Sequence, residues 1–394
     1  MPHERDAMIT GIGIASCLGS GTDAHWQALN NFSSVLDTDS FAPFAVHPLA
    51  PLVDLDKQIP KRGDQRQMEA WQRIGVYAAG LALDQAGAKG NTELLSRMGM
   101  IVAAGGGERD YAVDSAIMSG YPKAANPGAY LNEHLLGDLR PTLFLAQLSN
   151  LLAGNISIVH GVIGSSRTFM GEEASGADAV RIACARIAAG QGEIMLVGGS
   201  YNAQRSDFLL HIEMAQLLRR APFDSVWARQ ASGGGMILGS VGCFLVLESR
   251  AHAAARGAAA YAHIAAIRTD RCRRRPGEAT TNATAQLETM AGQYDRETTA
   301  VISGASGAPA ATLEEQSFLH QVGLPVRASA TALGSAPEPS FPASLALAAM
   351  SIRRGSLFPP LEAAEQPMTT PLQQALVTSW GHWRGEALAL VTAA

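Results

Sequence analysis

The chain has 394 residues, a length that fits one large domain or two fused units. Hydrophobic residues make up 47% of it and charged residues only 16%, which excludes intrinsic disorder and provides a sizeable core. The net charge of −5 argues against a nucleic-acid-binding protein, because such proteins depend on a basic surface.

Short apolar runs alternate with helical patterns along the whole chain. Apolar runs broken by glycine are typical of strands that are buried on both faces, and their alternation with helices predicts an α/β fold with a largely parallel sheet. The clearest helices are expected at residues 67–87 and 175–189. Strands are expected at residues 8–16, 98–104, 193–197, 235–247, 261–267, 300–303 and 375–379.

Apolar side chains cover most of the circumference of the helix expected at residues 175–189. Only Asp178, Arg181 and Arg186 interrupt this surface, a pattern that predicts a largely buried helix. Gly190 is expected to end it, since glycine is the usual residue just after a helix.

A boundary is expected near residue 250, where a predicted strand gives way to an Ala/Arg-rich segment. Four strand candidates precede this segment, and a shorter set in a similar order follows it. A duplicated α/β architecture explains such an order. We therefore divide the chain into halves spanning residues 1–250 and 251–394.

Neither a cofactor nor a metal site is predicted. Gly11 and Gly13 follow the pattern of a dinucleotide loop but lack its third glycine and its acidic residue, so we interpret this segment as a structural turn. The triplet of glycines at residues 105–107 is interpreted as a tight strand exit. Four scattered cysteines and ten histidines form no CxxC or HExxH motif.

The N-terminal segment is charged and lacks the apolar core of a signal peptide. No apolar run reaches the length of about 18 residues that predicts a membrane span. We therefore expect a cytoplasmic protein without a membrane span.

One short segment, RTDRCRRRP, is strongly basic. A charge run of this kind is either a solvated loop or a docking site for an acidic or phosphate-bearing partner, and the residues alone leave both readings open. Its arginines are Arg268, Arg271, Arg273, Arg274 and Arg275.

Motifs in a fixed order along essentially the whole chain resemble those of the β-ketoacyl-acyl carrier protein synthases. The resemblance implies the thiolase-like fold of that family, an α/β, five-layer αβαβα arrangement of two similar halves that normally forms a dimer. The motifs are ITGIGIASCLGSG with Trp26, SNLLAGNISIVHGVIGSS, ASGADAV followed by GEIMLVGGS, PFDSVWAR followed by MILGSVGCFLVLE, and IRRGSLFPP.

The resemblance places Glu173 at the position of the family's nucleophilic cysteine. In the family, this cysteine precedes Ala-Ser/Thr-Gly at the start of the buried helix, where the helix dipole lowers the pKa of the thiol. A carboxylate is stable at such a helix end. As an acyl carrier it would form an anhydride, which water destroys, so Glu173 is no substitute for a thiolate.

Other catalytic positions of the family are also emptied. The resemblance aligns its two histidines with Gly304 and Ser335, and its lysine with Ala330. Glu315 matches the acidic residue that pairs with that lysine. Because the histidines stabilise the carbanion or enolate formed by malonyl decarboxylation, no recognisable condensing machinery remains.

The family's glycine-rich gate loop corresponds to a loop with bulky side chains. We interpret its histidine as a filler of a disused pocket, the alternative being a stand-in for one of the lost histidines. The gate-loop residues are Gly381, His382, Trp383, Arg384 and Gly385.

Chain-length factors are ketosynthase-like proteins that lack the active cysteine and pair with an active ketosynthase. Many carry Gln where this chain has Glu173. Three segments, IPKRGDQRQMEAWQRIG, IVAAGGGERD and SSRTFMGEEASG, are similar to a ketosynthase-like protein of alphaproteobacteria that is associated with very-long-chain fatty acids of lipid A. Factors of aryl-polyene and aromatic-polyketide synthesis are the alternatives.

Three functions are therefore open. The first, which we favour, is a non-catalytic subunit that sets chain length for an active ketosynthase. The others are a malonyl-acyl carrier protein decarboxylase or condensing enzyme with an atypical site, and a homodimeric acyl-binding scaffold. Expected partners are an active ketosynthase or a second copy of the chain, and an acyl carrier protein that docks on Arg271, Arg273, Arg274 and Arg275.

Overall fold

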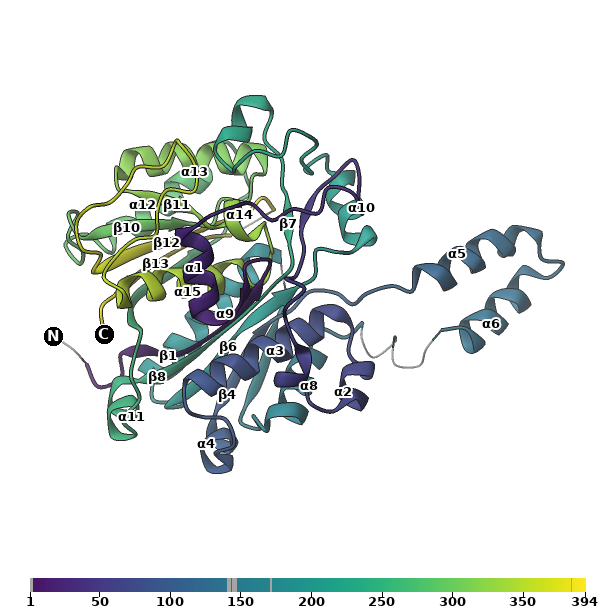
Figure 1. Ribbon diagram of the computed structural model, residues 1–394, viewed down its shortest axis with the longest axis horizontal. Helices are drawn as coiled ribbons and strands as arrows, with labels where there is room; N and C mark the ends of the chain where they lie inside the picture. Colours follow the sequence, from purple (N-terminus) through teal and green to yellow (C-terminus); the bar gives the residue numbers. More distant parts are fainter. Residues whose placement is uncertain (1–2, 140–142, 144–146, 171, 384) are drawn as a thin grey trace.

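The helices and strands form five alternating layers (Figure 1). The computed structural model describes residues 3–139, 143, 147–170, 172–383 and 385–394. In the central layer, α9 (Glu172–Ala188) packs against α15 (Ser340–Arg353). The outer layers contain α3 (Ala70–Gln85) with α8 (Leu151–His160), and α12 (Glu278–Glu288) with α13 (Pro309–Val322). The predicted αβαβα arrangement is confirmed.

Among the described residues, the main path of the sheet in the first half has five strands, in the spatial order β5-β4-β6-β8-β1, and β2 pairs with β1 off this path. If these five strands are numbered by their order in the sequence, their spatial order is 3-2-4-5-1. The fifth strand runs antiparallel to both of its neighbours. The strands are β1 (Ala7–Ser16), β4 (Gly99–Ala103), β5 (Ser166–Phe169), β6 (Ile194–Tyr201) and β8 (Val241–Ser249).

The second half repeats this topology in the spatial order β11-β10-β12-β13-β9. Its fifth strand is again antiparallel to both neighbours. The strands are β9 (Ala262–Asp270), β10 (Thr299–Ser303), β11 (Val326–Ala328), β12 (Gln374–Trp380) and β13 (Glu386–Thr392). The two halves are therefore similar. Our division between residues 250 and 251 stays a prediction; it falls in α11 (Arg250–Ala255), between β8 and β9.

The prediction of a largely parallel sheet is wrong. In the described part of the large sheet, parallel pairs lie toward the outer strands. The central pairs β6–β8, β8–β1, β1–β9, β9–β13 and β13–β12 are antiparallel. The short connection from β12 to β13 forces one of these pairs, because a hairpin reverses the chain. At the centre, Ala7–Ile9 of β1 pair with β9 and join the two sheets.

Shorter elements complete the described part of the chain. They are β2 (Gly19–Ser20), α1 (Gly21–Asn30), β3 (Val46–His47), α2 (Arg62–Gln67), α4 (Thr92–Arg97), α5 (Tyr111–Gly120), α6 (Pro127–Gly137), α10 (Ser206–Met214), β7 (Leu238–Gly239), α14 (Ser329–Leu333) and the 3-10 turns Leu55–Lys57, Tyr121–Lys123 and Ala228–Ser232.

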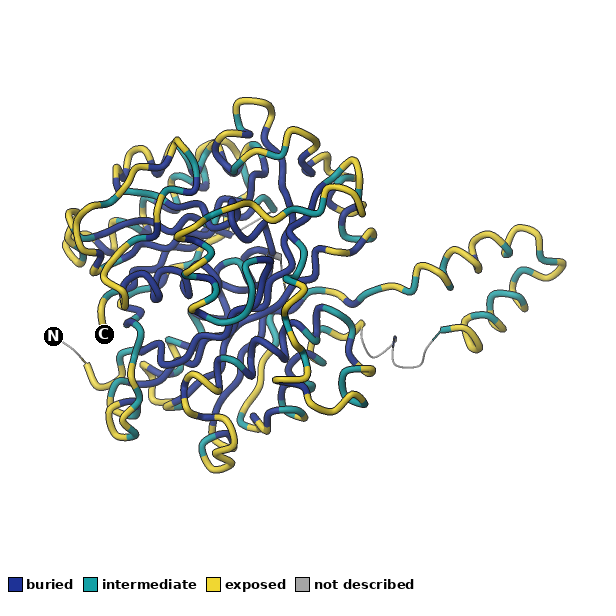
Figure 2. The backbone as a smooth tube through the Cα atoms, in the orientation of Figure 1, coloured by how far each residue is buried: buried dark blue, intermediate teal, exposed yellow. Residues whose placement is uncertain are grey.

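The central helix α9 is buried as predicted. Ala179, Val180 and Ala183 are completely inaccessible to solvent, and Figure 2 shows the buried interior of the body in dark blue. Gly190 follows with φ of 66°, the left-handed conformation expected of a residue that ends a helix. The helix begins three residues earlier than predicted, at Glu172, so that Glu173 lies in its first turn.

Gly11 and Gly13 lie inside β1 rather than in a turn, so this part of the prediction is wrong. A Cβ atom at Gly11 would lie 2.4 Å from the carbonyl oxygen of Ala82, and one at Gly13 would lie 1.9 Å from that of Ala78. Both carbonyls belong to α3. The glycines therefore allow α3 to pack closely on the strand.

An arm, residues 111–137, projects from the body and consists of α5 and α6 joined by a 3-10 turn (Figure 1). It is largely exposed (Figure 2), and Met118 and Leu136 leave 72% and 78% of their surface accessible. No helix among the described residues combines the length and hydrophobicity that crossing a membrane requires.

Candidate functional site

Glu173 contacts the gate loop. It lies in the first turn of α9, where free backbone N–H groups favour negative charge, and only 8% of it is exposed. Its Oε1 accepts a hydrogen bond of 2.8 Å from the backbone N–H of His382. This contact uses the backbone and not the imidazole, so it needs no histidine at position 382.

The gate loop connects β12 to β13. The N–H of Gly381 donates to the carbonyl oxygen of Gly385 across a distance of 3.0 Å, which closes the loop. Gly385 has φ of 90°, and a Cβ atom there would lie 2.6 Å from the Cβ of Ala174, beside Glu173. Glycine at 385 therefore permits the loop to approach the start of α9.

Two aromatic rings fill the tip of the gate loop. The rings of His382 and Trp383 pack edge to face, with 5.0 Å between their centroids. Burial and the nearby charge of Arg274 lower the pKa of His382, which favours a neutral ring. Our interpretation of His382 as a filler stays a prediction. Arg384 lies outside the described residues.

No room for a side chain exists at Gly304, the position aligned with the first histidine. A Cβ atom there would lie 2.6 Å from the carbonyl oxygen of Thr378 on β12. The N–H of Gly304 also donates to the hydroxyl of Thr378 at 3.2 Å. A histidine at this position would have to displace the backbone of a central strand.

Glu315 on α13 is completely buried. Its Oε1 accepts hydrogen bonds from the hydroxyls of Ser303 (2.7 Å) and Thr378 (2.5 Å), whereas Oε2 has no hydrogen-bond partner among the described residues. Burial raises the pKa of this carboxyl to about 7. Ala330 is buried close by, since its neighbour Ser329 donates to the carbonyl oxygen of Ser303. An alanine at this position supplies no cation to the carboxyl.

Ser335, aligned with the second histidine, is held by backbone contacts. Its N–H donates to the carbonyl oxygen of Ile237 at 2.8 Å, and its own carbonyl accepts from the N–H of Gly239 at 3.0 Å. The structure thus brings Gly304, Glu315 and Ala330 together around Ser303 and Thr378. Thr378 precedes the gate loop by three residues, so the end of β12 links this group to Glu173.

The arginine segment divides into surface and interior residues. Arg271 is 59% exposed and pairs with Asp178 at 2.8 Å, and Arg273 and Arg275 are also exposed. Arg274 is only 18% exposed; it contacts the buried Glu386 and donates to the carbonyl oxygen of Gly385 at 3.0 Å. Arg274 therefore supports the gate loop, and its prediction as a surface docking residue is corrected.

Two pairs that resemble catalytic dyads escaped the sequence analysis. Ser16 Oγ lies 2.8 Å from Nε2 of His25, and Cys17 Sγ lies 3.8 Å from Nδ1 of His47. All four side chains are buried, and burial raises the pKa of Cys17 to about 12 and lowers that of both histidines to about 4. They are structural contacts, and their spacing in the sequence matches no motif.

A cavity of about 480 Å³ beside the start of α9 was also missed. Its walls include Gly105, Gly106, Gly107, Met170 and Glu338. The glycine triplet is visible in the sequence, but Glu338 comes from a segment more than 200 residues away. No group of three or more histidine, cysteine, aspartate or glutamate side chains within the described ranges is arranged to hold a metal ion.

Two curated relatives each match about two thirds of this chain. 3-Oxoacyl-[acyl-carrier-protein] synthase 2 of Vibrio harveyi is 26% identical over 271 residues, 66% of this chain and 62% of that protein. Nodulation protein E of Rhizobium leguminosarum bv. trifolii is 29% identical over 275 residues, which are 67% of this chain and 63% of the relative. The chain thus matches slightly less than two thirds of the length of these relatives.

The structure known as the ishigamide ketosynthase/chain length factor has a similar fold. Its TM-score is 0.78 at 17% identity, and the match covers 99% of both chains. The family model described as the N-terminal domain of β-ketoacyl synthase matches residues 4–253. The thiolase-like fold is therefore confirmed, and the chain belongs to the β-ketoacyl synthase family.

Proposed function

We propose that this chain is a non-catalytic subunit that pairs with an active ketosynthase and helps to set the length of the acyl or polyketide product. The observation that carries this proposal is the carboxylate of Glu173 at the position of the nucleophile. It is buried and hydrogen-bonded to the gate loop, so the site keeps its architecture although the acyl-accepting atom is absent.

The other aligned positions support the same conclusion. Gly304 leaves no space for an imidazole, and Ala330 and Ser335 bring neither a cation nor an imidazole to the site. Condensation needs groups that stabilise the negative charge developing after decarboxylation, and such groups contribute several kcal/mol to catalysis. A chain that lacks them all is better suited to shaping a product than to forming it.

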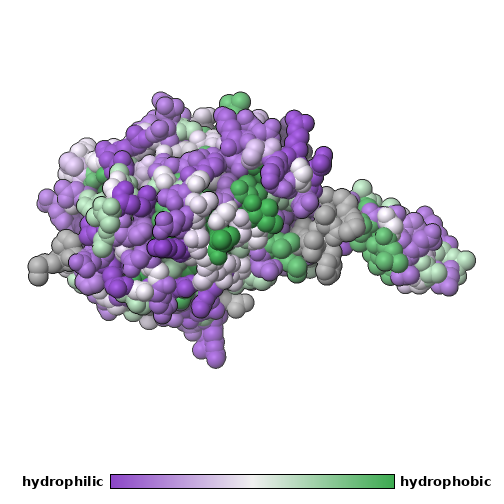
Figure 3. All heavy atoms as spheres, turned by 90° about the horizontal axis from the view of Figure 1, so that it is seen from below, coloured by the Kyte–Doolittle hydropathy of each residue, from purple (hydrophilic) through white to green (hydrophobic). Residues whose placement is uncertain are grey.

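A partner surface is available at the edge of the first sheet. Among the described residues, β5 is an end strand that pairs only with β4, so its outer edge can accept a further strand. Ile158, Ile163 and Met170 flank this edge and are 72%, 67% and 65% exposed. Figure 3 shows apolar surface on the body beside the arm and on the arm itself. We assign this face to the ketosynthase subunit.

The exposed arginines are suited to an acidic carrier protein. Arg271, Arg273 and Arg275 lie on the segment that Arg274 connects to the gate loop. A carrier protein on these side chains would therefore be placed near the gate. The relative from Vibrio harveyi is by name a 3-oxoacyl-[acyl-carrier-protein] synthase, which supports this choice of partner.

A condensation assay tests the proposal. Malonyl and acyl carrier proteins are incubated with this chain alone, with a co-expressed active ketosynthase, and with both. We expect no product from the chain alone, and longer products from the pair than from the ketosynthase. A heterodimer in size-exclusion chromatography is the accompanying physical readout.

Any other outcome of this assay would indicate a different function. Condensation by the chain alone would overturn the proposal, and release of carbon dioxide from malonyl carrier protein would identify a decarboxylase. A homodimer that carries acyl chains and ignores the ketosynthase would identify a scaffold. Replacing Arg271, Arg273 and Arg275 with glutamate while keeping Arg274 separates carrier docking from the integrity of the gate.

A further inference from the structure

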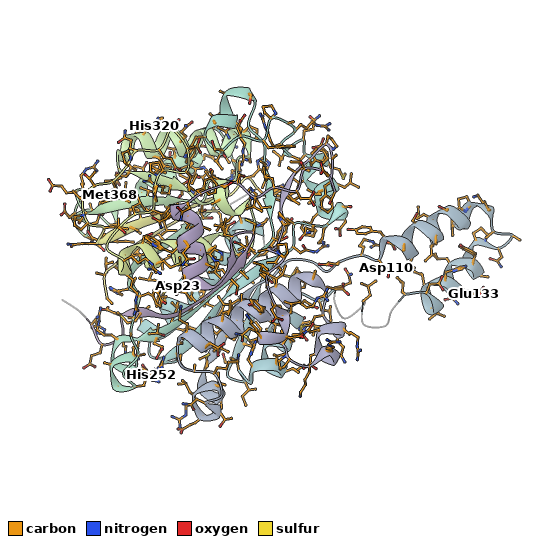
Figure 4. The ribbon with its side chains drawn as sticks, in the orientation of Figure 1. Asp23, Asp110, Glu133, His252, His320 and Met368 are labelled. Atoms are coloured by element: carbon orange, nitrogen blue, oxygen red, sulfur yellow. The ribbon has the colours of Figure 1, made fainter. Side chains whose placement is uncertain are left out.

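A small cavity lies between the loop at residues 32–36 and the loop at residues 223–225. Helix α1, which Asp23 marks in Figure 4, leads into the first of these loops. The cavity has a volume of about 70 Å³, which gives room for roughly five water-sized atoms. It therefore excludes an acyl chain and accepts only a ligand of a few atoms. Its apolar lining includes Leu36, Phe223, Ile237 and Leu361.

Arg229 brings a buried cation to the wall of this cavity. Only 1% of the residue is exposed. Its guanidinium donates to the backbone carbonyl oxygens of Asp224 at 3.5 Å and Ser306 at 3.3 Å, and both distances are longer than is usual for N–H···O bonds. Nε has no hydrogen-bond partner among the described residues. An arginine has more N–H donors than these two long contacts use.

The nearby carboxylates are engaged elsewhere. Asp224 pairs with Arg219 at 3.9 Å, and the carboxylate of Glu362 accepts hydrogen bonds from the segment 225–228. In the part of the chain that the structure describes, neither carboxylate forms an ion pair with Arg229. Burial and the positive charge of Arg219 lower the pKa of Arg229 to about 10. The guanidinium thus stays charged at neutral pH without a direct counterion among these side chains.

The other titratable groups of the wall do not cancel this charge. His47 is 2% exposed, and burial together with the charge of Arg229 lowers its pKa to about 4, so its ring is neutral at pH 7. Asp224 also lines the cavity, but 49% of its side chain is exposed, and water and salt screen an exposed charge more than a buried one. The electrostatic potential inside the cavity is therefore positive.

We infer that this cavity binds a small monovalent anion, such as chloride or nitrate, and that Arg229 is the cation that holds it. A buried charge is costly unless it is paired, and a small anion supplies the missing partner without a change in the surrounding loops. A neutral molecule would leave the guanidinium unpaired. The inference goes beyond the proposed function and does not depend on it, because anion binding is measured on this chain without a ketosynthase.

Chlorine NMR of the full chain tests the inference, since the chloride signal broadens when the ion exchanges with a protein site. We expect the wild-type chain to broaden the signal and nitrate to reverse the broadening. Benzenesulfonate is also monovalent but is too large for the cavity, so it should not reverse the part that nitrate removes. Arginines on the surface would bind both competitors, and the comparison therefore separates the cavity from the surface.

Three variants complete the design. In Arg229→Met the Kd for chloride should rise roughly 10-fold or more, because the charged hydrogen-bond donors are lost. Arg229→Lys, which keeps a cation, should bind chloride more tightly than Arg229→Met. Arg97→Met removes a cation whose side chain is 76% exposed on α4, and it should keep the wild-type Kd.

Three results would overturn the inference. They are a wild-type chain without nitrate-reversible broadening, equal displacement of chloride by nitrate and benzenesulfonate, and an unchanged Kd in Arg229→Met. The two competitors are compared on the wild-type chain, so the test still decides if Arg229→Met does not fold.

Discussion

Replacing the buried carboxyl of Glu315 should make the protein more stable at high pH. The residue is completely buried, and Oε2 has no hydrogen-bond partner among the described residues. In Glu315→Gln, the amide oxygen is expected to accept from Ser303 and Thr378 as Oε1 does now. The variant thus keeps the contacts and loses the charge.

The size of this stabilisation follows from the pKa of Glu315, which burial raises from 4.5 to about 7. Because the folded-state pKa is raised, the contribution of this group is fully present below pH 4.5 and is lost as the pH rises through about 7. The loss amounts to about 3 kcal/mol at pH 8. The free energy of unfolding of Glu315→Gln, relative to that of the wild type, should therefore increase by about 3 kcal/mol between pH 4 and pH 8.

Urea unfolding of both proteins across this pH range measures the difference. Subtracting one curve from the other cancels the titration of every other group. Glu288→Gln is the matched control, because Glu288 is exposed and its substitution should change stability by less than about 0.5 kcal/mol. A difference between Glu315→Gln and the wild type that stays constant with pH would refute the reasoning.

Three further predictions concern the site and its surfaces. Glu173→Cys should accept no acyl group and support no condensation, since the other catalytic positions stay empty; a radiolabelled acyl transfer that succeeds would contradict this. Arg274→Ala should destabilise the fold by about 3 kcal/mol in denaturant unfolding, because it leaves the carboxylate of Glu386 buried without its cation, whereas Arg273→Ala should cost little. Ile163→Asp should weaken the heterodimer at least about 10-fold in sedimentation equilibrium, and an unchanged Kd would exclude β5 from the interface.

The sequence predicted seven of the ten strands on the main path of the described sheet, but not β5, β11 or β13. Residues 8–16 and 98–104 are mostly apolar runs broken by glycine, and they form β1 and β4 nearly as expected. The helix α9 was equally clear, since the first half of its described surface is buried in the central layer, although Ala185 and Ala188 near its end are exposed. The sequence did not show whether neighbouring strands run parallel or antiparallel. A strand that is buried on both faces has an apolar sequence in either case.

Side-chain direction explains what the sequence analysis missed at the site. In RCRRR, Arg274 is indistinguishable from its neighbours, yet it has φ of 59° and points to Glu386 while Arg273 and Arg275 are exposed. Glu338 matches no motif in the sequence. It lines a cavity together with Gly105 only because the fold brings these two distant residues together. The functional division of the chain at residue 250 stays a prediction.

The backbone around Gly304 leaves no space for a histidine at the position that the resemblance aligns with the family's first histidine. The nearest obstacle to a side chain is the carbonyl oxygen of Thr378, and the hydroxyl of that same residue binds both the N–H of Gly304 and the carboxyl of Glu315. A histidine at 304 would therefore break two hydrogen bonds and move β12, which leads directly into the gate loop. The substitution would thereby also disturb Glu315 and, through β12, the gate loop.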